Sequence, residues 1–231
     1  MLKEQNPYTK ICIKTIIVMA FYFLCYTYPS EILKFLSINI DKMNLFCKAT
    51  VLTLYEALIL FTVIYAYKEE LKQSIKNFKI SYIKEYIKYW FLILILMLIS
   101  NNIVSIFTTT EVATNQEIII ETLKKAPMYI LITTIFIAPL LEELIFRFCI
   151  KKIIPKPSIV YILISGLLFG SMHVIFTLKN PIDLLFIIPY SIPGIIFAYL
   201  YNKTNNILIP ASIHFIHNGV LMLLEVILQL V

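Results

Sequence analysis

Seven long runs of apolar residues limit what this chain can fold into more than any other feature of its sequence. A helix needs about 20 mostly apolar residues to cross a bilayer, and every run comes close to that length. The runs cover Ile11–Tyr28, Phe46–Tyr67, Tyr89–Phe107, Met128–Ile150, Ser158–Thr177, Asp183–Tyr201 and Ile207–Leu230. The sequence therefore predicts an all-α fold, a polytopic membrane helix bundle of about seven transmembrane helices.

Composition supports the membrane interpretation. Apolar residues make up 60% of the chain and charged residues 15%, whereas a soluble domain is nearer half apolar and a quarter charged. The net charge is +6, but the lysines lie between the apolar runs, and no basic patch is interleaved with stacking aromatics outside them. We therefore expect membrane lipids, and no nucleic acid, as partners. The four cysteines have no CxxC spacing, so they are interpreted as apolar filler.

The distribution of lysines predicts the orientation in the membrane. With the N-terminus inside, thirteen lysines fall in inner segments and six in outer ones. Cytoplasmic loops carry the excess of basic residues, so the N-terminus is expected in the cytoplasm. The composition rich in Ile, Lys and Asn is typical of a low-GC bacterial genome, which makes a bacterial cytoplasmic membrane the expected location. The first run lacks a small-residue cleavage site after it and is expected to be retained.

Two shorter segments lie outside the runs. Residues 68–89 place apolar side chains at helical spacing with lysines on the other face, as in an amphipathic helix on an anionic leaflet. A helical extension of the neighbouring spans fits equally well. Residues Glu31–Ile40 are predicted to form an interfacial turn of helix or a re-entrant segment. We divide the bundle into N-terminal helices, 1–126, with the amphipathic segment at 68–89, and a core at 127–231.

An acid pair in the fourth run is the first candidate for chemistry. Ionisable side chains inside a bilayer are costly unless paired or hydrated, so each is a functional candidate. On a helix, Glu143 precedes Arg147 by four residues, the favourable order for an ion pair. Glu142 points about 100° away and has no partner on its own helix, so it can act as a general base. A purely structural role for both acids is less favoured, because one carboxylate suffices for Arg147.

The fifth run adds a histidine. Gly166 and Gly170 form a small-xxx-small face that lets another helix approach closely. Phe169 lies one turn before His173 and can pack against its ring. Counting about 1.5 Å per residue from the run ends places Glu142, and His214 of the seventh run, about 10–12 Å from the inner face, but His173 about 22 Å from it. To bring them together, the fourth helix must extend past Lys152, or the fifth must begin later or tilt.

The seventh run adds two further histidines and an amide. His214 and Asn218 are four residues apart and share a helix face, whereas His217 shares that face less well. The alternative interpretation is a hydrogen-bond cluster that joins helices, and it is strongest for His217.

Two chemistries fit these residues. In one, Glu142 and His173 activate a water, while His214 and Asn218 donate to the oxyanion of the tetrahedral intermediate. In the other, His173, His214 and Glu142 bind zinc, which activates the water. The cofactor is therefore either none or a single divalent metal. Asn218 is a poor zinc ligand but a good amide donor, which favours the first scheme.

The three motifs together resemble those of a known family. Glu142-Glu143-x-x-x-Arg147, Phe169-x-x-x-His173 and His214-x-x-x-Asn218 resemble, in order and spacing, the motif set of the CPBP family, also called Abi. That family comprises CAAX prenyl endopeptidases and bacteriocin-processing or bacteriocin-immunity proteins. The resemblance covers roughly residues 127–220. It implies an intramembrane peptidase whose catalytic core is the C-terminal four helices, with catalytic roles for Glu142, His173, His214 and Asn218 and supporting roles for Glu143, Arg147 and Phe169.

We therefore expect an intramembrane endopeptidase that hydrolyses a peptide bond of a small protein or peptide precursor with a Glu/His-activated water. Bacteria generally lack CAAX prenylation, so a pheromone or bacteriocin precursor suits better than a CAAX-type substrate. The alternative is a non-catalytic bacteriocin immunity or scaffold membrane protein, which has no need for an unpaired Glu142. A proton-coupled transporter is less favoured, because it would carry internal repeats and broken helices in both halves.

Overall fold

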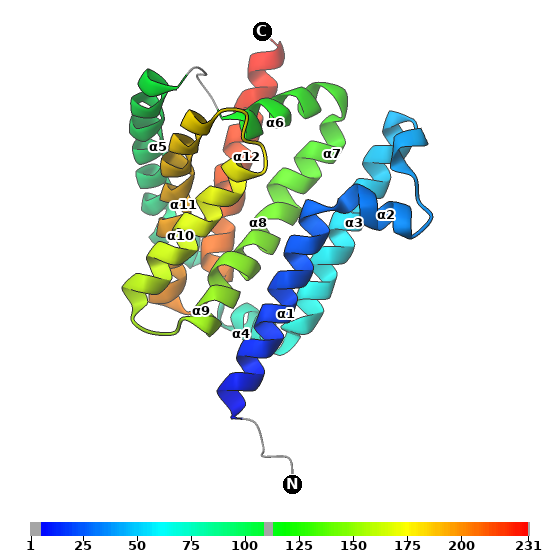
Figure 1. Ribbon diagram of the computed structural model, residues 1–231. Helices are drawn as coiled ribbons and strands as arrows, with labels where there is room; N and C mark the ends of the chain where they lie inside the picture. Colours follow the sequence, from blue (N-terminus) through cyan, green and yellow to red (C-terminus); the bar gives the residue numbers. More distant parts are fainter. Residues whose placement is uncertain (1–5, 109–112, 231) are drawn as a thin grey trace.

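The computed structural model describes residues 6–108 and 113–230, and in these ranges every regular element is a helix (Figure 1). The elements are α1 (Pro7–Thr27), α2 (Pro29–Phe35), η1 (Ile40–Lys42), α3 (Leu45–Ala66), α4 (Lys68–Asn77), α5 (Ser81–Phe107), α6 (Thr114–Lys125), α7 (Pro127–Ile132), η2 (Thr133–Ile137), α8 (Ala138–Glu142), η3 (Glu143–Cys149), α9 (Ile150–Ile153), α10 (Ser158–Ile175), η4 (Pro181–Phe186), α11 (Ile187–Thr204) and α12 (Leu208–Leu230).

The predicted helical membrane bundle is confirmed. Seven helical stretches in the described residues are long and apolar enough to cross a membrane, and each coincides with one predicted run. The fourth stretch, 127–153, joins α7, η2, α8, η3 and α9 end to end. It extends one residue past Lys152, and α10 begins at Ser158, where the sequence predicted it. Of the alternatives considered for these two helices, the structure shows the extension of the fourth past Lys152 and not a later start of the fifth.

Residues 68–89 do not form a single amphipathic helix, and their second part follows the alternative, an extension of a neighbouring span. Helix α4 ends at Asn77, Phe78 is extended, and the remainder of the segment forms the first turns of α5. The break lets Phe78 pack against the buried cluster of α5, α11 and α12. Leu71 is buried against the bundle, so α4 packs on protein, although Ile75 is 64% exposed on its outer side. Helix α6 was not predicted, because its turns are amphipathic and too short to span.

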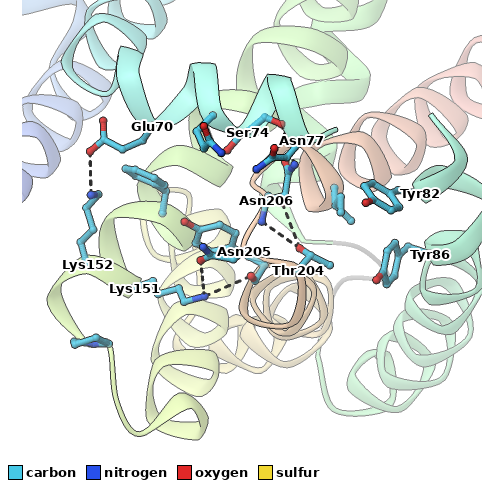
Figure 2. Close-up of a pocket in the computed structure, with 15 residues that line it drawn as sticks. Glu70, Ser74, Asn77, Tyr82, Tyr86, Lys151, Lys152, Thr204, Asn205 and Asn206 are labelled. Atoms are coloured by element: carbon cyan, nitrogen blue, oxygen red, sulfur yellow. Dashed lines mark hydrogen bonds and ion pairs between the residues drawn. The ribbon is translucent and has the colours of Figure 1, made fainter. Parts of the chain in front are cut away.

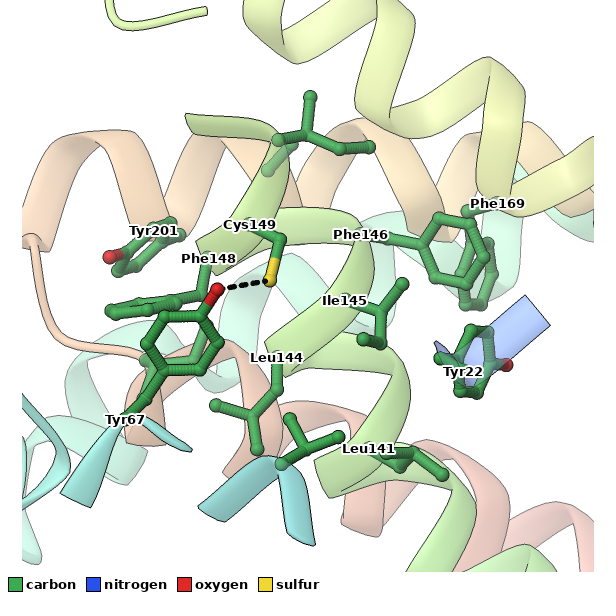
Figure 3. Close-up of a cluster of buried hydrophobic side chains, with 14 of the residues drawn as sticks. Tyr22, Tyr67, Leu141, Leu144, Ile145, Phe146, Phe148, Cys149, Phe169 and Tyr201 are labelled. Carbon is green, nitrogen blue, oxygen red and sulfur yellow. Dashed lines mark hydrogen bonds between the residues drawn. The ribbon is translucent and has the colours of Figure 1, made fainter. Parts of the chain in front are cut away.

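The fourth span is the centre of the bundle. Figure 1 shows α1 and α3 on one side of it and α10, α11 and α12 on the other. Figure 3 shows its side chains Leu144, Ile145 and Phe146 pointing into a core shared with Tyr22 of α1 and Phe169 of α10. Because this span is buried on several sides, its polar residues are held by protein and not by lipid.

Two stretches of the fourth span, η2 and η3, wind more loosely than an α-helix, as π-helix. Such segments are often found at functional sites. Pro139 explains part of this winding, because it has no N–H to donate to the preceding turn. The N–H of Ala138 donates to the Thr133 carbonyl, five residues back. The second loose stretch begins at Glu143, so the two predicted acids lie on either side of a change in helix winding.

The predicted small-residue face on α10 is confirmed. A Cβ added to Gly166 would lie 2.7 Å from the backbone nitrogen of Ile195, and one on Gly170 would lie 2.8 Å from the Ile187 carbonyl oxygen. From the other side, a Cβ on Gly194 would lie 2.8 Å from the Gly166 carbonyl oxygen. Helices α10 and α11 are therefore in direct backbone contact, which no larger residue permits.

Candidate active site

Glu143 contacts one residue of its own span and one residue of α12. Its Oε2 lies 3.1 Å from Nε of Arg147, the predicted ion pair, and its Oε1 lies 3.0 Å from Nδ1 of His214. Both Glu143 and Arg147 are 0% exposed. With Glu143 assigned as the carboxylate of this ion pair, its oxygens can only accept hydrogen bonds, so Nδ1 of His214 is assigned as the donor.

This hydrogen bond fixes the tautomer of His214. A neutral imidazole has one N–H, and here it faces Glu143, which leaves Nε2 with a free lone pair. Nε2 of His214 lies 3.7 Å from Oε2 of Glu142, too far for a hydrogen bond but suited to a bridging water. The neutral ring can accept from such a water, whereas the predicted donation to an oxyanion requires a protonated ring.

Two phenylalanines hold the charged and aromatic groups in place. The guanidinium of Arg147 lies over the rings of Phe169 and Phe197, 4.3 and 5.4 Å from their centroids. The ring of His214 stacks on Phe197 at 4.8 Å and meets Phe169 edge to face at 5.7 Å. These aromatic faces attract a buried cation, the Arg147 guanidinium, whose three nitrogens all lack hydrogen-bond partners among the described residues.

The side chain of Glu142 is 15% exposed. It lines a cavity of about 280 Å³ whose walls come from α1, α2, α3 and the fourth span. His173, His214 and Asn218 do not line that cavity. The predicted unpaired acid thus faces the N-terminal helices, a placement that the C-terminal motifs gave no reason to expect.

His173 is held mainly by its own helix and by α11. Its Nδ1 lies 2.9 Å from the Phe169 carbonyl oxygen, which can only accept, so Nδ1–H is the donor and Nε2 is free. The ring contacts Phe169 at 4.6 Å and stacks on Tyr190 at 5.0 Å. Both His173 and His214 therefore touch the Phe169 ring, which brings the motif histidines into one aromatic cluster.

Asn218 has a partner that the sequence did not suggest. Its Nδ2 donates to the carbonyl oxygen of Thr134, 2.9 Å away in η2. One amide N–H remains for another acceptor. His217, for which a structural role was favoured most, is buried, and its Nδ1 has no hydrogen-bond partner in the described part of the chain.

The predicted zinc ligands do not form a preassembled site. Among the described residues, no group of three His, Cys, Asp or Glu side chains is close enough to hold a metal ion. Of the set His173, His214 and Glu142, the last two face each other across 3.7 Å, while His173 points toward Phe169 and Tyr190. The three residues as arranged do not fit a three-ligand zinc site.

Sequence reasoning missed several residues of this region. Phe197 of α11 belongs to no motif. The only signal for it in the sequence is that it is an aromatic residue on the helix that packs against the glycine face of α10. Glu56 of α3 lines the Glu142 cavity and accepts a 2.8 Å hydrogen bond from the hydroxyl of Tyr129. Glu56 could have been recognised from the sequence, because it is an acidic residue in the middle of an apolar run.

Comparison with known proteins points to one family. The model of the family described as type II CAAX prenyl endopeptidase Rce1-like matches residues 124–220, which include all seven predicted site residues. The chain is 28% identical over 113 residues to the "Putative membrane peptidase YdiL" of Bacillus subtilis (strain 168). That alignment covers 48% of this chain and 43% of the relative, so the chain spans less than half of the relative's length. No solved structure matches. The resemblance expected from the three motifs is confirmed for the C-terminal half.

Proposed function

We propose that this chain is an intramembrane endopeptidase acting on a small protein or peptide precursor. The premise is that residues 124–220 carry the core of a CPBP-type membrane peptidase. One observation carries the proposal. Oε2 of Glu142 and Nε2 of His214 face each other across 3.7 Å, and the other nitrogen of His214 is held by Glu143. This arrangement suits a water placed between two hydrogen-bond acceptors.

The proposed hydrolysis uses a water and side chains of this protein. A water that donates one hydrogen to Glu142 and the other to His214 presents its oxygen lone pair to a peptide carbonyl. As the C–O bond forms, Glu142 takes a proton from the water. The proton then passes to the leaving nitrogen as the C–N bond breaks, which gives a new carboxyl terminus and a new amino terminus. The remaining N–H of Asn218 is the candidate donor to the oxyanion.

The cavity beside Glu142 supports a peptide substrate. Its volume of about 280 Å³ suits a few side chains of an extended peptide, and it lies on the side of α1–α3. The N-terminal helices would then contribute to substrate binding, although they carry no family motif. The substrate class favoured here is a bacterial pheromone or bacteriocin precursor in the cytoplasmic membrane, with the N-terminus of the enzyme in the cytoplasm.

Peptide mapping in cells tests the proposal. Cells that express the wild-type chain, Glu142→Gln or Glu225→Gln would be compared for new peptide termini in the membrane fraction by mass spectrometry. Glu225 is another acidic residue within a span, accepts a hydrogen bond from Gln116, and serves as the matched control. We expect a product with the wild type and with Glu225→Gln, and none with Glu142→Gln. Full cleavage by purified Glu142→Gln protein would refute the assignment.

A further inference from the structure

A large polar pocket lies at one end of the bundle, outside the candidate active site (Figure 2). Its volume is about 730 Å³, within the range of small-molecule sites. Its walls come from α4, the last turns of the fourth span and α11, the turn at Asn205 and Asn206, and the first turns of α5 and α12. Because these are the ends of membrane spans, the pocket lies at the boundary between the lipid and water.

The pocket is built by tertiary contacts and not by loose loops. Nδ2 of Asn206 donates to the Ser74 carbonyl at 2.9 Å, which ties the turn after α11 to α4. Asn205 has a positive φ of 51°, and its Oδ1 accepts a hydrogen bond from Nζ of Lys151 on α9. Figure 2 shows Tyr82 and Tyr86 closing the opposite wall. Tyrosines at this depth are typical of the interfacial belt of membrane proteins.

The charges of the pocket do not balance. Of its lining residues, Glu70 alone carries a carboxylate, and it pairs with Lys152 at 3.1 Å. Burial, the largest single influence, acts to raise the pKa of Glu70, but the hydrogen bond from Lys152, a backbone hydrogen bond and the charges of Lys152 and Lys14 together outweigh it, so the pKa is lowered and the carboxylate stays ionised. Lys151 reaches only neutral acceptors, the Tyr201 carbonyl at 3.5 Å and Oδ1 of Asn205 at 3.4 Å. One cation therefore remains without an anion in the described pocket.

The surface around the pocket is also basic. Exposed lysines follow one another along α4 and the start of α5, at positions 68, 72, 76, 79, 84 and 88. Such a cluster next to a membrane attracts anionic lipids. The pocket adds to this diffuse attraction a defined site with a cation, amide groups and hydroxyl groups.

We propose that this pocket binds the phosphate headgroup of an anionic phospholipid, with Lys151 as its cation. Amides and tyrosine hydroxyls around the pocket are suited to the remaining phosphate and glycerol oxygens. The acyl chains would leave toward the lipid, where Ile75 and Ile80 are exposed. This inference does not depend on peptide hydrolysis, so either proposal can fail alone.

Lipid binding to the purified full chain tests the proposal. Thermal unfolding and native mass spectrometry would be measured with phosphatidylglycerol and with phosphatidylcholine, for wild type, Lys151→Gln and Lys76→Gln. Lys76 is exposed on α4 and does not line the pocket, so its variant changes the net charge equally. We expect preferential binding of phosphatidylglycerol, weakened about tenfold by Lys151→Gln and less than twofold by Lys76→Gln.

Further variants and ligands distinguish a defined lipid site from diffuse surface attraction and from binding of a soluble phosphate. Lys151→Arg keeps the charge and should keep the preference, which provides a readout if Lys151→Gln does not fold. Equal losses in Lys151→Gln and Lys76→Gln would show diffuse surface attraction and overturn the proposal. Stabilisation by inorganic phosphate or glycerol phosphate, without a preference among lipids, would assign the pocket to a soluble phosphate and also overturn it.

Discussion

Nδ2 of Asn218 donates to the carbonyl oxygen of Thr134, and the residue five positions on, which would donate to this carbonyl in a π-helix, is Pro139. In the loose winding of η2, the N–H of Ala138 donates to Thr133, and the next residue along is Pro139, which has no N–H. The motif asparagine therefore completes the hydrogen bonding of the span that carries Glu142. This structural role exists beside any role in catalysis.

That relationship gives a rescue experiment. Asn218→Ala should cost about 1–3 kcal/mol of unfolding free energy, because it leaves the Thr134 carbonyl without a partner. Pro139→Ala restores an N–H one turn after Thr134, so the double variant should lose less stability than the sum of the two single variants. Unfolding in detergent followed by circular dichroism measures all four proteins. Strict additivity would contradict the role assigned to Asn218.

The two neighbouring acids should respond differently to the same substitution. Glu143→Gln removes the counter-ion of a fully buried Arg147 and should destabilise the protein by roughly 3–5 kcal/mol. Glu142→Gln should leave stability within about 1 kcal/mol of the wild type while removing cleavage. Denaturation midpoints of the purified variants check this, with Glu143→Gln/Arg147→Met as the control that removes both charges. Equal stabilities of the two single variants would contradict the structure.

Close packing of α10 and α11 predicts which glycines can be replaced. Gly166→Ala and Gly170→Ala should each destabilise by about 1–3 kcal/mol or prevent folding, since their Cβ atoms would overlap backbone atoms. Gly219→Ala is the matched control. The nearest atom to a Cβ at Gly219 is 3.8 Å away, so this variant should be neutral or slightly more stable. Expression level and Tm separate the two cases.

The orientation is predicted from the lysines and can be tested by labelling. After replacement of the four native cysteines, a cysteine at exposed Ser158 should react with an impermeant maleimide only in inverted vesicles. A cysteine at exposed Glu121, in α6 at the opposite end of the bundle, should react only in intact cells (Figure 1). The reverse pattern would place the polar pocket on the outer face.

Removal of metal tests the arrangement of His173, His214 and Glu142. Because these side chains do not converge as three ligands, the purified enzyme should keep its activity after treatment with a strong chelator. Elemental analysis of the treated enzyme provides the control. Zinc in one-to-one ratio, with activity lost on removal and restored on addition, would require His173 to rearrange toward Glu142.

Much of the fold followed from the sequence because the signals were local. Each span is a long apolar run, and the Glu143–Arg147 pair and the glycine face depend on spacing along one helix. The partners of Asn218 and the stacking of His214 on Phe197 depend on contacts between helices far apart in sequence. No spacing within one helix predicts them. The break at Phe78 was also beyond local reasoning, because a tertiary contact decides it.

Backbone contact at Gly166 and Gly194 has a mechanical consequence. Two helices without a side-chain layer between them cannot slide or separate without loss of the whole interface, so α10 and α11 behave as one rigid block. Glu142 faces away from that block, into the cavity beside α1–α3. Under the proposed function, a peptide that reaches this cavity from the lipid would therefore be admitted by movement of α1–α3, which lie outside the rigid block.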